Sequence, residues 1–111
     1  TLLDCVRYAH KAGGIGNVAQ IVKDIGARAD ARKLAAAAAH YEGAAARRLG
    51  YLLEVAGHAR ASKSLRRYAD EARHFAALDT GLEPVVAALD DEPQRDASWK
   101  LLIHEPVEVD A

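Results

Sequence analysis

Hydrophobic residues recur every three or four positions from residue 2 to residue 56, the spacing of one buried face of an α-helix. Glycines interrupt the pattern, and glycine favours turns over helix interiors. The breaks predict four helices, over residues 2–10, 15–25, 31–41 and 45–56. Asp30 is the expected N-cap of the third helix, which Gly43 is expected to break. Gly57 is the expected C′ residue of the fourth.

A fifth helix is predicted to follow, with Ser62 as its N-cap. One of its faces carries the residues that we expect to be buried: Leu65, Tyr68, Ala69, Ala72 and Phe75. Three residues of this face should pack against the leucines of the fourth helix, with Trp99 closing one end. The predicted core therefore contains Leu49, Leu52, Leu53, Leu65, Tyr68, Phe75 and Trp99.

Beyond residue 78 the spacing changes from that of helices to that of strands. Residues 84–89 predict a short strand with proline at its first position, and residues 90–97 a charged loop. Residues 99–104 alternate in the manner of a half-buried strand, which residues 107–110 could continue. The chain is thus predicted to be an α+β domain, predominantly helical, with about five helices followed by a C-terminal two-stranded β-hairpin-like unit. Its 111 residues fit a single domain, 1–111.

The charges are unevenly distributed along the chain. Residues 1–77 contain 13 Lys and Arg against 7 Asp and Glu, whereas residues 78–111 contain 2 against 9. The overall net charge of −1 is too balanced for a dedicated nucleic-acid binder. The single cysteine, Cys5, excludes an internal disulfide and fits a reducing, cytoplasmic location. No apolar run is long enough to span a membrane, and a chain that begins at Thr1 without any methionine is expected to be a fragment.

Three patterns suggest chemistry, and each has a simpler explanation. Residues 14–19 match a dinucleotide-binding fingerprint, but they follow a predicted helix rather than a strand, so a helix–helix turn is favoured. Glu71 and His74 have the spacing of a di-iron carboxylate–histidine pair, but no second copy exists and both lie on a polar face. Cys5 lies beside a hydrophobic stripe, where a buried free thiol is ordinary. We therefore predict no enzymatic activity, no cofactor and no metal.

Two groups of basic residues are candidates for binding. Residues 35–52 loosely fit a helix-turn-helix, whose second helix would present Arg47, Arg48 and Tyr51 outward to DNA. Against this, Glu42 stands where the motif needs an apolar residue, and an ordinary helical hairpin also fits. The second group is Arg60, Lys63, Arg66, Arg67 and Arg73, partly compensated by the i,i+4 pairs Arg66–Asp70 and Arg67–Glu71. It is either a solvated helix face or a docking surface for an acidic partner.

Several segments of the chain resemble the AbiEi-type antitoxins of type IV abortive-infection toxin–antitoxin systems. Residues 1–4, T-L-L-D, look like the family's T-L-x-D signature. Residues 46–54, A-R-R-L-G-Y-L-L-E, with Gly57 after them, are similar to its recurrent R-R-L-G-Y-L-L-E-x-x-G segment. Residues 84–85, 89–90 and 99–101 resemble its closing proline, leucine–aspartate and tryptophan elements. His104 in place of asparagine and the acidic residues 90–96 depart from the family.

The resemblance implies the C-terminal half of a transcriptional regulator whose N-terminal winged helix-turn-helix, absent here, binds promoter DNA. This half would counteract a nucleotidyltransferase-like toxin without forming a stable complex, in defence against phage. The expected binding residues are Arg47, Arg48, Tyr51, Arg60, Lys63, Arg66 and Arg67. The alternatives are a stand-alone helix-turn-helix-like DNA-binding module and an oligomerisation module.

Overall fold

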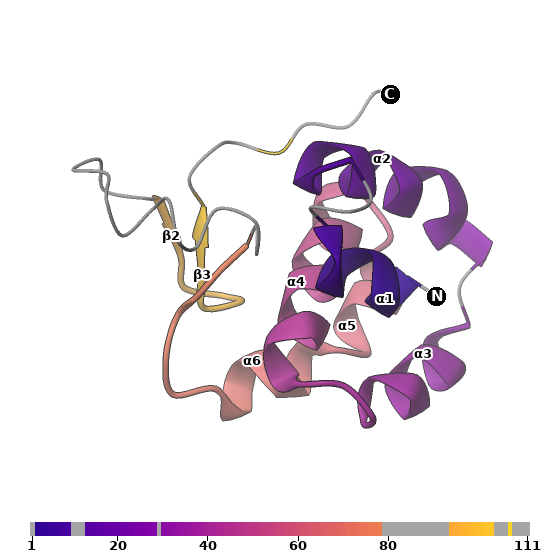
Figure 1. The fold of residues 1–111 in the computed structure, drawn as a ribbon. Helices are drawn as coiled ribbons and strands as arrows, with labels where there is room; N and C mark the ends of the chain where they lie inside the picture. The colour runs from indigo at the N-terminus through magenta and orange to yellow at the C-terminus, as the bar shows by residue number, and fades with distance from the viewer. Residues whose placement is uncertain (1, 10–12, 29, 79–93, 104–106, 108–111) are drawn as a thin grey trace.

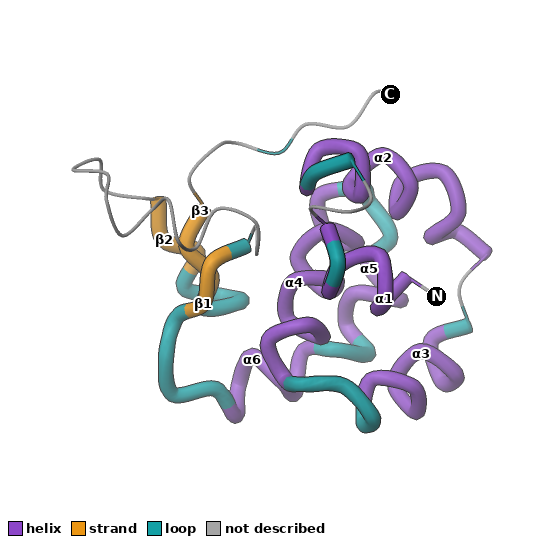
Figure 2. Tube along the Cα trace, viewed as in Figure 1, coloured by secondary structure: helices purple, strands orange, loops and turns teal. Residues whose placement is uncertain are grey.

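A computed structural model of the chain describes residues 2–9, 13–28, 30–78, 94–103 and 107, and the fold is stated for these. Helices come first along the chain and a small sheet last, and the two parts lie side by side (Figure 1; Figure 2). The helices are α1 (Leu2–Arg7), α2 (Ile15–Ile25), the 3-10 turn η2 (Gly26–Arg28), α3 (Ala31–Ala38), α4 (Gly43–Val55), α5 (Ala59–Lys63) and α6 (Arg66–Glu71). The strands are β1 (Ala76–Ala77), β2 (Gln94–Asp96) and β3 (Leu101–Ile103). The predicted α+β, predominantly helical fold is confirmed.

Helix α4 is the centre of the molecule and contacts each of the other described α-helices. Its leucines Leu49, Leu52 and Leu53 are fully buried, and Leu65 and Trp99 are buried with them, as predicted. Alanines let neighbouring helices approach α4 closely, since Ala45 and Ala46 have no exposed surface. Because all five of these α-helices pack on α4, its side chains determine how the helical part is assembled.

Two predicted helix caps are confirmed. The Asp30 side chain accepts hydrogen bonds from the backbone N–H groups of Arg32 and Lys33 at the start of α3. Gly57 has a φ of 86° after the end of α4, a conformation that glycine adopts without strain. Its N–H donates to Glu54 O, and that of His58 donates to Leu53 O, which is the Schellman pattern.

The prediction that Gly43 breaks a helix is wrong. Helix α3 ends at Ala38, and Gly43 is the first residue of α4. Glycine lowers helix stability by about 0.5–1 kcal/mol relative to alanine, which does not prevent a 13-residue helix from starting at Gly43. The turn between α3 and α4 is instead formed by residues 39–42.

The predicted fifth helix is two short helices, α5 and α6, with Leu65 between them. Ser62 is not an N-cap, because α5 begins at Ala59, directly after the Gly57 turn. Its hydroxyl instead donates to Gly50 O at 2.8 Å and joins α5 to α4. Phe75, predicted to be in the core, lies beyond the end of α6 and is 39% exposed, with the Arg95 guanidinium over its ring.

The strands form a mixed sheet with the order β1-β3-β2, where two strands were expected. β2 and β3 are the antiparallel, hairpin-like pair, while β1 adds to β3 in parallel, with Ala76 opposite Leu101. The residues of β2 were predicted to be part of the charged loop at 90–97, and that part of the prediction is wrong. Leu101 and Ile103 face inward as predicted.

Other predicted segments fall on residues that the structure does not describe. They are the strand at 84–89, residues 90–93 of the charged loop, His104 and residues 108–110. Val107 is described and lies in no strand, although it packs against the core.

Candidate functional site

The two arginines at the centre of α4 are buried. Only 7% of Arg47 and 5% of Arg48 is exposed. The prediction that both face outward is therefore wrong. Helical periodicity identified one buried stripe on α4, but the sheet covers a second face of the same helix.

Both guanidinium groups bind backbone carbonyls around the sheet. Arg47 Nη1 donates to His74 O at 3.0 Å and to Lys100 O at 2.8 Å. Arg48 Nε donates to Ala77 O at 2.7 Å. Among the described strands β1 lies at the edge of the sheet, and Arg48 satisfies a carbonyl on that strand. The arginine pair thus joins α4 to β1 and to the turn before β3.

The environment of Arg47 is electrostatically unfavourable. Burial lowers the pKa of Arg47, and the neighbouring charge of Arg48 lowers it further. Arg47 Nε is buried and has no hydrogen-bond partner among the described residues. Hydrogen bonds to neutral carbonyls stabilise this cation, but they do not supply a counter-charge.

Gly50, Glu54 and Trp99 complete the contact between α4 and the sheet region. A Cβ at Gly50 would lie 2.3 Å from Cζ3 of Trp99, so only glycine leaves room for the indole. Trp99 Nε1 donates to Glu54 Oε2 at 2.7 Å. These contacts, with the arginine bonds, explain most of the R-R-L-G-Y-L-L-E segment by packing rather than by binding.

Tyr51 is the one predicted outward residue of α4 that keeps partial exposure. Burial raises the pKa of the Tyr51 phenol, and the carboxylates of Asp96 and Glu54 raise it further. Tyr51 therefore lies at the margin of the contact with the sheet and remains a binding candidate.

Four basic residues lie on the consecutive helices α5 and α6, and we refer to them together as the α5–α6 basic surface: Arg60, Lys63, Arg66 and Arg67. All are exposed except Arg66, which is half-buried. The predicted pairs are confirmed, since Arg66 Nε lies 3.9 Å from Asp70 Oδ1 and Arg67 Nε 4.0 Å from Glu71 Oε1.

The members of this surface differ in how firmly they are held. The Arg66 guanidinium lies over the Trp99 ring, 5.1 Å from its centroid, and that of Arg67 lies over Tyr68 at 5.3 Å. In the described part of the chain, Arg60 and Lys63 make no ion pair. Their charges are therefore the most available to a partner.

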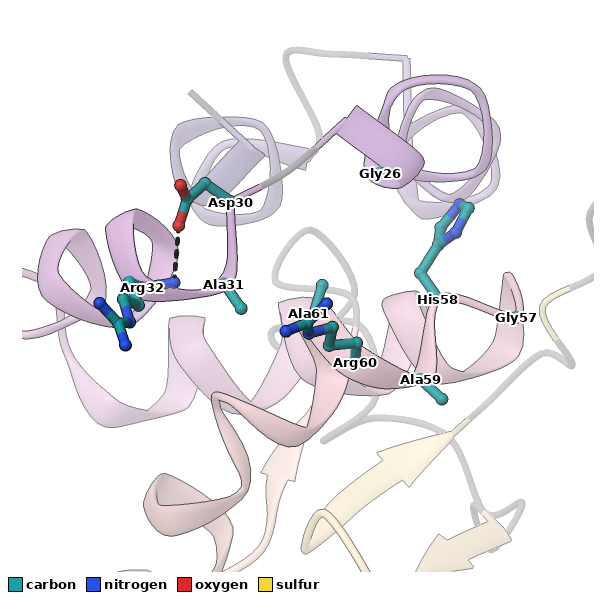
Figure 3. Close-up of a pocket in the computed structure, with 9 residues that line it drawn as sticks. All are labelled: Gly26, Asp30, Ala31, Arg32, Gly57, His58, Ala59, Arg60 and Ala61. Carbon is teal, nitrogen blue, oxygen red and sulfur yellow. Dashed lines mark hydrogen bonds between the residues drawn. The ribbon is translucent and has the colours of Figure 1, made fainter.

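An open pocket of about 750 Å³ lies between the start of α3 and the start of α5 (Figure 3). Its walls are mainly glycine and alanine, and its charged side chains are Asp30, Arg32 and Arg60. The Asp30 carboxylate is used in capping α3, and His58 Nε2 lies 3.0 Å from Lys23 O. Sequence reasoning missed this pocket because it treated residues 58–61 as a connection rather than as the start of a helix.

The helix-turn-helix interpretation is not supported by the position of α4. A recognition helix must expose a face to the major groove. Most of α4 from Ala45 to Leu53 is buried beneath other elements. The objection raised by Glu42 also holds, since its side chain is exposed and pairs with Arg7 at 3.3 Å.

The remaining chemical patterns have structural explanations. Gly13 and Gly14 have φ values of 91° and 90° in the turn from α1 to α2, as expected for a helix–helix turn. Glu71 and His74 are exposed, and Cys5 is half-buried as a free thiol. Within the described ranges, no three His, Cys, Asp or Glu side chains lie close enough to hold a metal ion together. None of the helices described there is long and apolar enough to cross a bilayer.

Comparison with known proteins identifies the first half of the chain. A family model described as the AbiEi antitoxin C-terminal domain matches residues 1–55, from α1 to the last residue of α4. No curated protein and no solved structure matches the chain. The match includes the arginine pair, Gly50 and Glu54, which contact the sheet beyond it. Residues 1–55 of this chain therefore belong to the AbiEi antitoxin C-terminal domain family.

Proposed function

We propose that this chain is the antitoxin domain of a bacterial type IV toxin–antitoxin transcriptional regulator. It acts in the cytoplasm as a single, non-catalytic domain, counteracts a nucleotidyltransferase-like toxin and assists regulation of its own promoter. The observation that carries the proposal is the family match over α1 to α4. A cognate toxin is the partner that such a family implies.

The α5–α6 basic surface is the region that we assign to partner contact. Arg47 and Arg48 are occupied by backbone carbonyls, so they position the sheet and do not face a partner. Arg60, Lys63 and Arg67 are exposed on two consecutive short helices, both of which contact α4, and Tyr51 of α4 is partly exposed. Arginine and lysine at exposed sites attract acidic surfaces and steer association.

The test is to express the chain in bacteria that carry the neighbouring toxin gene and to measure growth. Growth is suited to the question because a stable complex is not expected. We expect rescue by the native chain and loss of rescue when Arg60, Lys63 and Arg67 are changed together to Glu. A matched variant, Arg28→Glu with Lys33→Glu on η2 and α3, should still rescue.

Both variants need to be shown to be folded by circular dichroism. Continued growth arrest with the folded native chain would refute the antitoxin role. Rescue by the triple Glu variant would refute the surface assignment alone.

A second candidate is DNA binding by the chain itself. The α5–α6 basic surface, rather than α4, would then contact phosphates, and affinity would fall steeply with salt. Salt-dependent binding that the triple Glu variant loses would support this function. An oligomerisation module would instead give a mass in solution that rises with concentration.

A further inference from the structure

The open pocket between α3 and α5, which we call the α3–α5 pocket, is lined mainly by residues without long side chains (Figure 3). Its volume of about 750 Å³ can hold one or more side chains of another molecule. Glycines and alanines form most of its walls. The charged side chains of the lining therefore determine which ligand it can select, and these are Asp30, Arg32 and Arg60.

Two guanidinium groups line this pocket without a counter-charge. Figure 3 shows Arg32 on α3, on one side of the pocket, and Arg60 on α5, on the other. Both residues are exposed, and within the described ranges neither side chain makes an ion pair or a hydrogen bond. Charges of one sign around a concave site concentrate the electrostatic potential there. The pocket therefore attracts negatively charged groups.

Asp30, the carboxylate of the lining, does not neutralise the arginines. Its Oδ1 accepts hydrogen bonds from the backbone N–H groups of Arg32 at 2.9 Å and of Lys33 at 3.2 Å, as the cap of α3. It makes no ion pair with Arg32 or Arg60. Two arginines against one carboxylate leave the charged side chains of the lining with a net positive charge.

The wall of the pocket beside His58 is held by contacts between separate elements. His58 Nε2 lies 3.0 Å from Lys23 O, and a Cβ on Gly26 would lie 2.5 Å from His58 Cδ2, so the ring packs directly on this glycine. Lys23 Nζ donates to Ala56 O at 3.5 Å. These contacts join the end of α2 to the start of α5, so the pocket is formed before a ligand arrives, which lowers the cost of binding.

The lining favours a carboxylate of a protein over two other kinds of ligand. Sites for small molecules are mostly apolar and enclose their ligand, whereas this pocket is open and lined by small residues. Single-stranded nucleic acids stack their bases on aromatic rings, and the ring of this lining, His58, is packed on Gly26. An Asp or Glu side chain needs only guanidinium groups and an open entrance, since the rest of the partner stays outside.

We propose that the α3–α5 pocket receives an acidic segment of a partner protein, whose carboxylates bind Arg32 and Arg60. A guanidinium group can bind a carboxylate through two parallel hydrogen bonds. Arg60 also belongs to the α5–α6 basic surface, so the inference rests on the partner contact proposed for that surface and extends it to α3. Its test does not use antitoxin activity, because it measures the binding of a peptide to the isolated chain.

The experiment is an NMR titration of the ¹⁵N-labelled chain with hexaglutamate whose two ends are capped, with sodium chloride adjusted to keep the ionic strength constant. We expect shifts of the backbone amide signals of Ala31, Arg32 and Arg60, and of the Nε–H signals of both arginines. Capped hexaglutamine, a peptide of the same length without charge, should shift none of these signals.

Variants of the lining separate this pocket from a general attraction of charges. Arg32→Gln and Arg60→Gln should each weaken hexaglutamate binding about tenfold, the effect of losing a charge-assisted hydrogen bond. Lys33→Gln, at an exposed neighbour outside the lining, is the matched control and should bind as the native chain does. Ala59→Leu, at an exposed position of the wall, fills the pocket without changing any charge and should also weaken binding.

Three results would overturn the proposal. The first is hexaglutamate shifts confined to Lys63 and Arg67, without a response at Arg32. The second is native affinity in Ala59→Leu, because the peptide would then bind outside the pocket. The third is a single-stranded oligonucleotide that shifts the pocket signals when hexaglutamate does not, because the ligand would then be a nucleic acid.

The pocket and the antitoxin role can fail separately. Hexaglutamate binding at Arg32 and Arg60, by a folded chain that does not rescue growth, would refute the antitoxin role and support the pocket. Rescue of growth by a chain that does not bind hexaglutamate would refute the pocket alone.

Discussion

The arginines of α4 and those of α5 and α6 have the same chemistry and opposite surroundings. Arg47 and Arg48 are almost fully buried and donate to backbone carbonyls of the sheet region. Arg60 and Arg67 are exposed. Both groups come from alanine-rich helical sequence, so neither composition nor local helix propensity distinguishes them. The difference is set by the sheet region, whose carbonyls bind Arg47 and Arg48 while Arg60 and Arg67 stay exposed.

This comparison separates stability from binding. Hydrogen bonds from a charged group to a buried acceptor contribute about 1.5–3 kcal/mol, and leaving the acceptor unpaired removes that contribution. Exposed ion pairs such as Arg67–Glu71 contribute about 0–1 kcal/mol. Substitutions in α4 should therefore act on folding, and substitutions on the α5–α6 basic surface on partner contact.

The largest difference in the free energy of unfolding is expected between the variants Arg48→Met and Lys63→Met. Arg48→Met removes the donor to Ala77 O and should lower the free energy of unfolding by about 2–3 kcal/mol. Lys63→Met, on the exposed surface, should change it by about 0.5 kcal/mol or less. Urea unfolding followed by circular dichroism measures both. Equal effects would mean that the two groups of cations do not differ in structural role.

A smaller difference in stability is expected between alanine substitutions at two glycines of α4, Gly50 and Gly43. Gly50→Ala places a Cβ against the Trp99 indole, at a packing cost of about 1–3 kcal/mol. Alanine regains about 0.5–1 kcal/mol in helix propensity, so a net loss of up to about 2.5 kcal/mol should remain. Gly43→Ala meets open space and should be neutral or stabilising. The midpoints of thermal unfolding of both variants test this, and a Gly50→Ala variant more stable than the native chain would show that the indole does not pack as described.

A still smaller effect should follow from the bond between Glu54 and Trp99. Glu54→Ala removes the acceptor of the indole N–H and should cost about 1 kcal/mol. Glu54→Gln keeps an acceptor oxygen and should cost less than half as much. Tryptophan fluorescence during urea unfolding reports on the same contact. If the two variants are equally stable, the hydrogen bond does not hold the sheet region to α4.

The order of the helices was predictable because local signals agree with the packing. Asp30 is a capping residue directly before a helix, and Gly57 adopts the positive φ that its position after the last turn implies. The leucines of α4 follow the helical period and are buried. Such features depend on residues close together in the chain, so the sequence contains the information directly.

The candidate site was less predictable because it depends on contacts between distant segments. Arg47 bonds to a carbonyl 53 positions away, and nothing in residues 43–55 signals a sheet above them. Arginine is usually exposed, which led to the wrong orientation for both residues. The pocket between α3 and α5 likewise needs two separate segments to be placed together. A helical pattern therefore assigns an outward orientation to charged residues that in fact bind the backbone at the edge of a sheet.

Tyr51 is neither as buried as the arginines of α4 nor as exposed as Arg60, Lys63 and Arg67 of α5 and α6. The pKa of its phenol indicates whether it is part of the contact with the sheet or of the exposed surface. Burial raises the pKa of its phenol above the ordinary value of 10.0, with Asp96 and Glu54 adding to the effect. A raised pKa in the folded state means that the folded chain retains a proton that the unfolded chain loses. The resulting stability is complete below pH 10 and is lost as the pH rises through the folded-state value.

Tyr51→Phe should therefore match the native chain at pH 7 and lose less stability than the native chain above pH 10. Urea unfolding at several pH values measures this difference, and Tyr8→Phe, at a more exposed tyrosine, is the matched control. If the native chain and Tyr51→Phe follow the same pH dependence, Tyr51 behaves as a solvated residue. It would then belong with the surface that meets a partner rather than with the contact that holds the sheet.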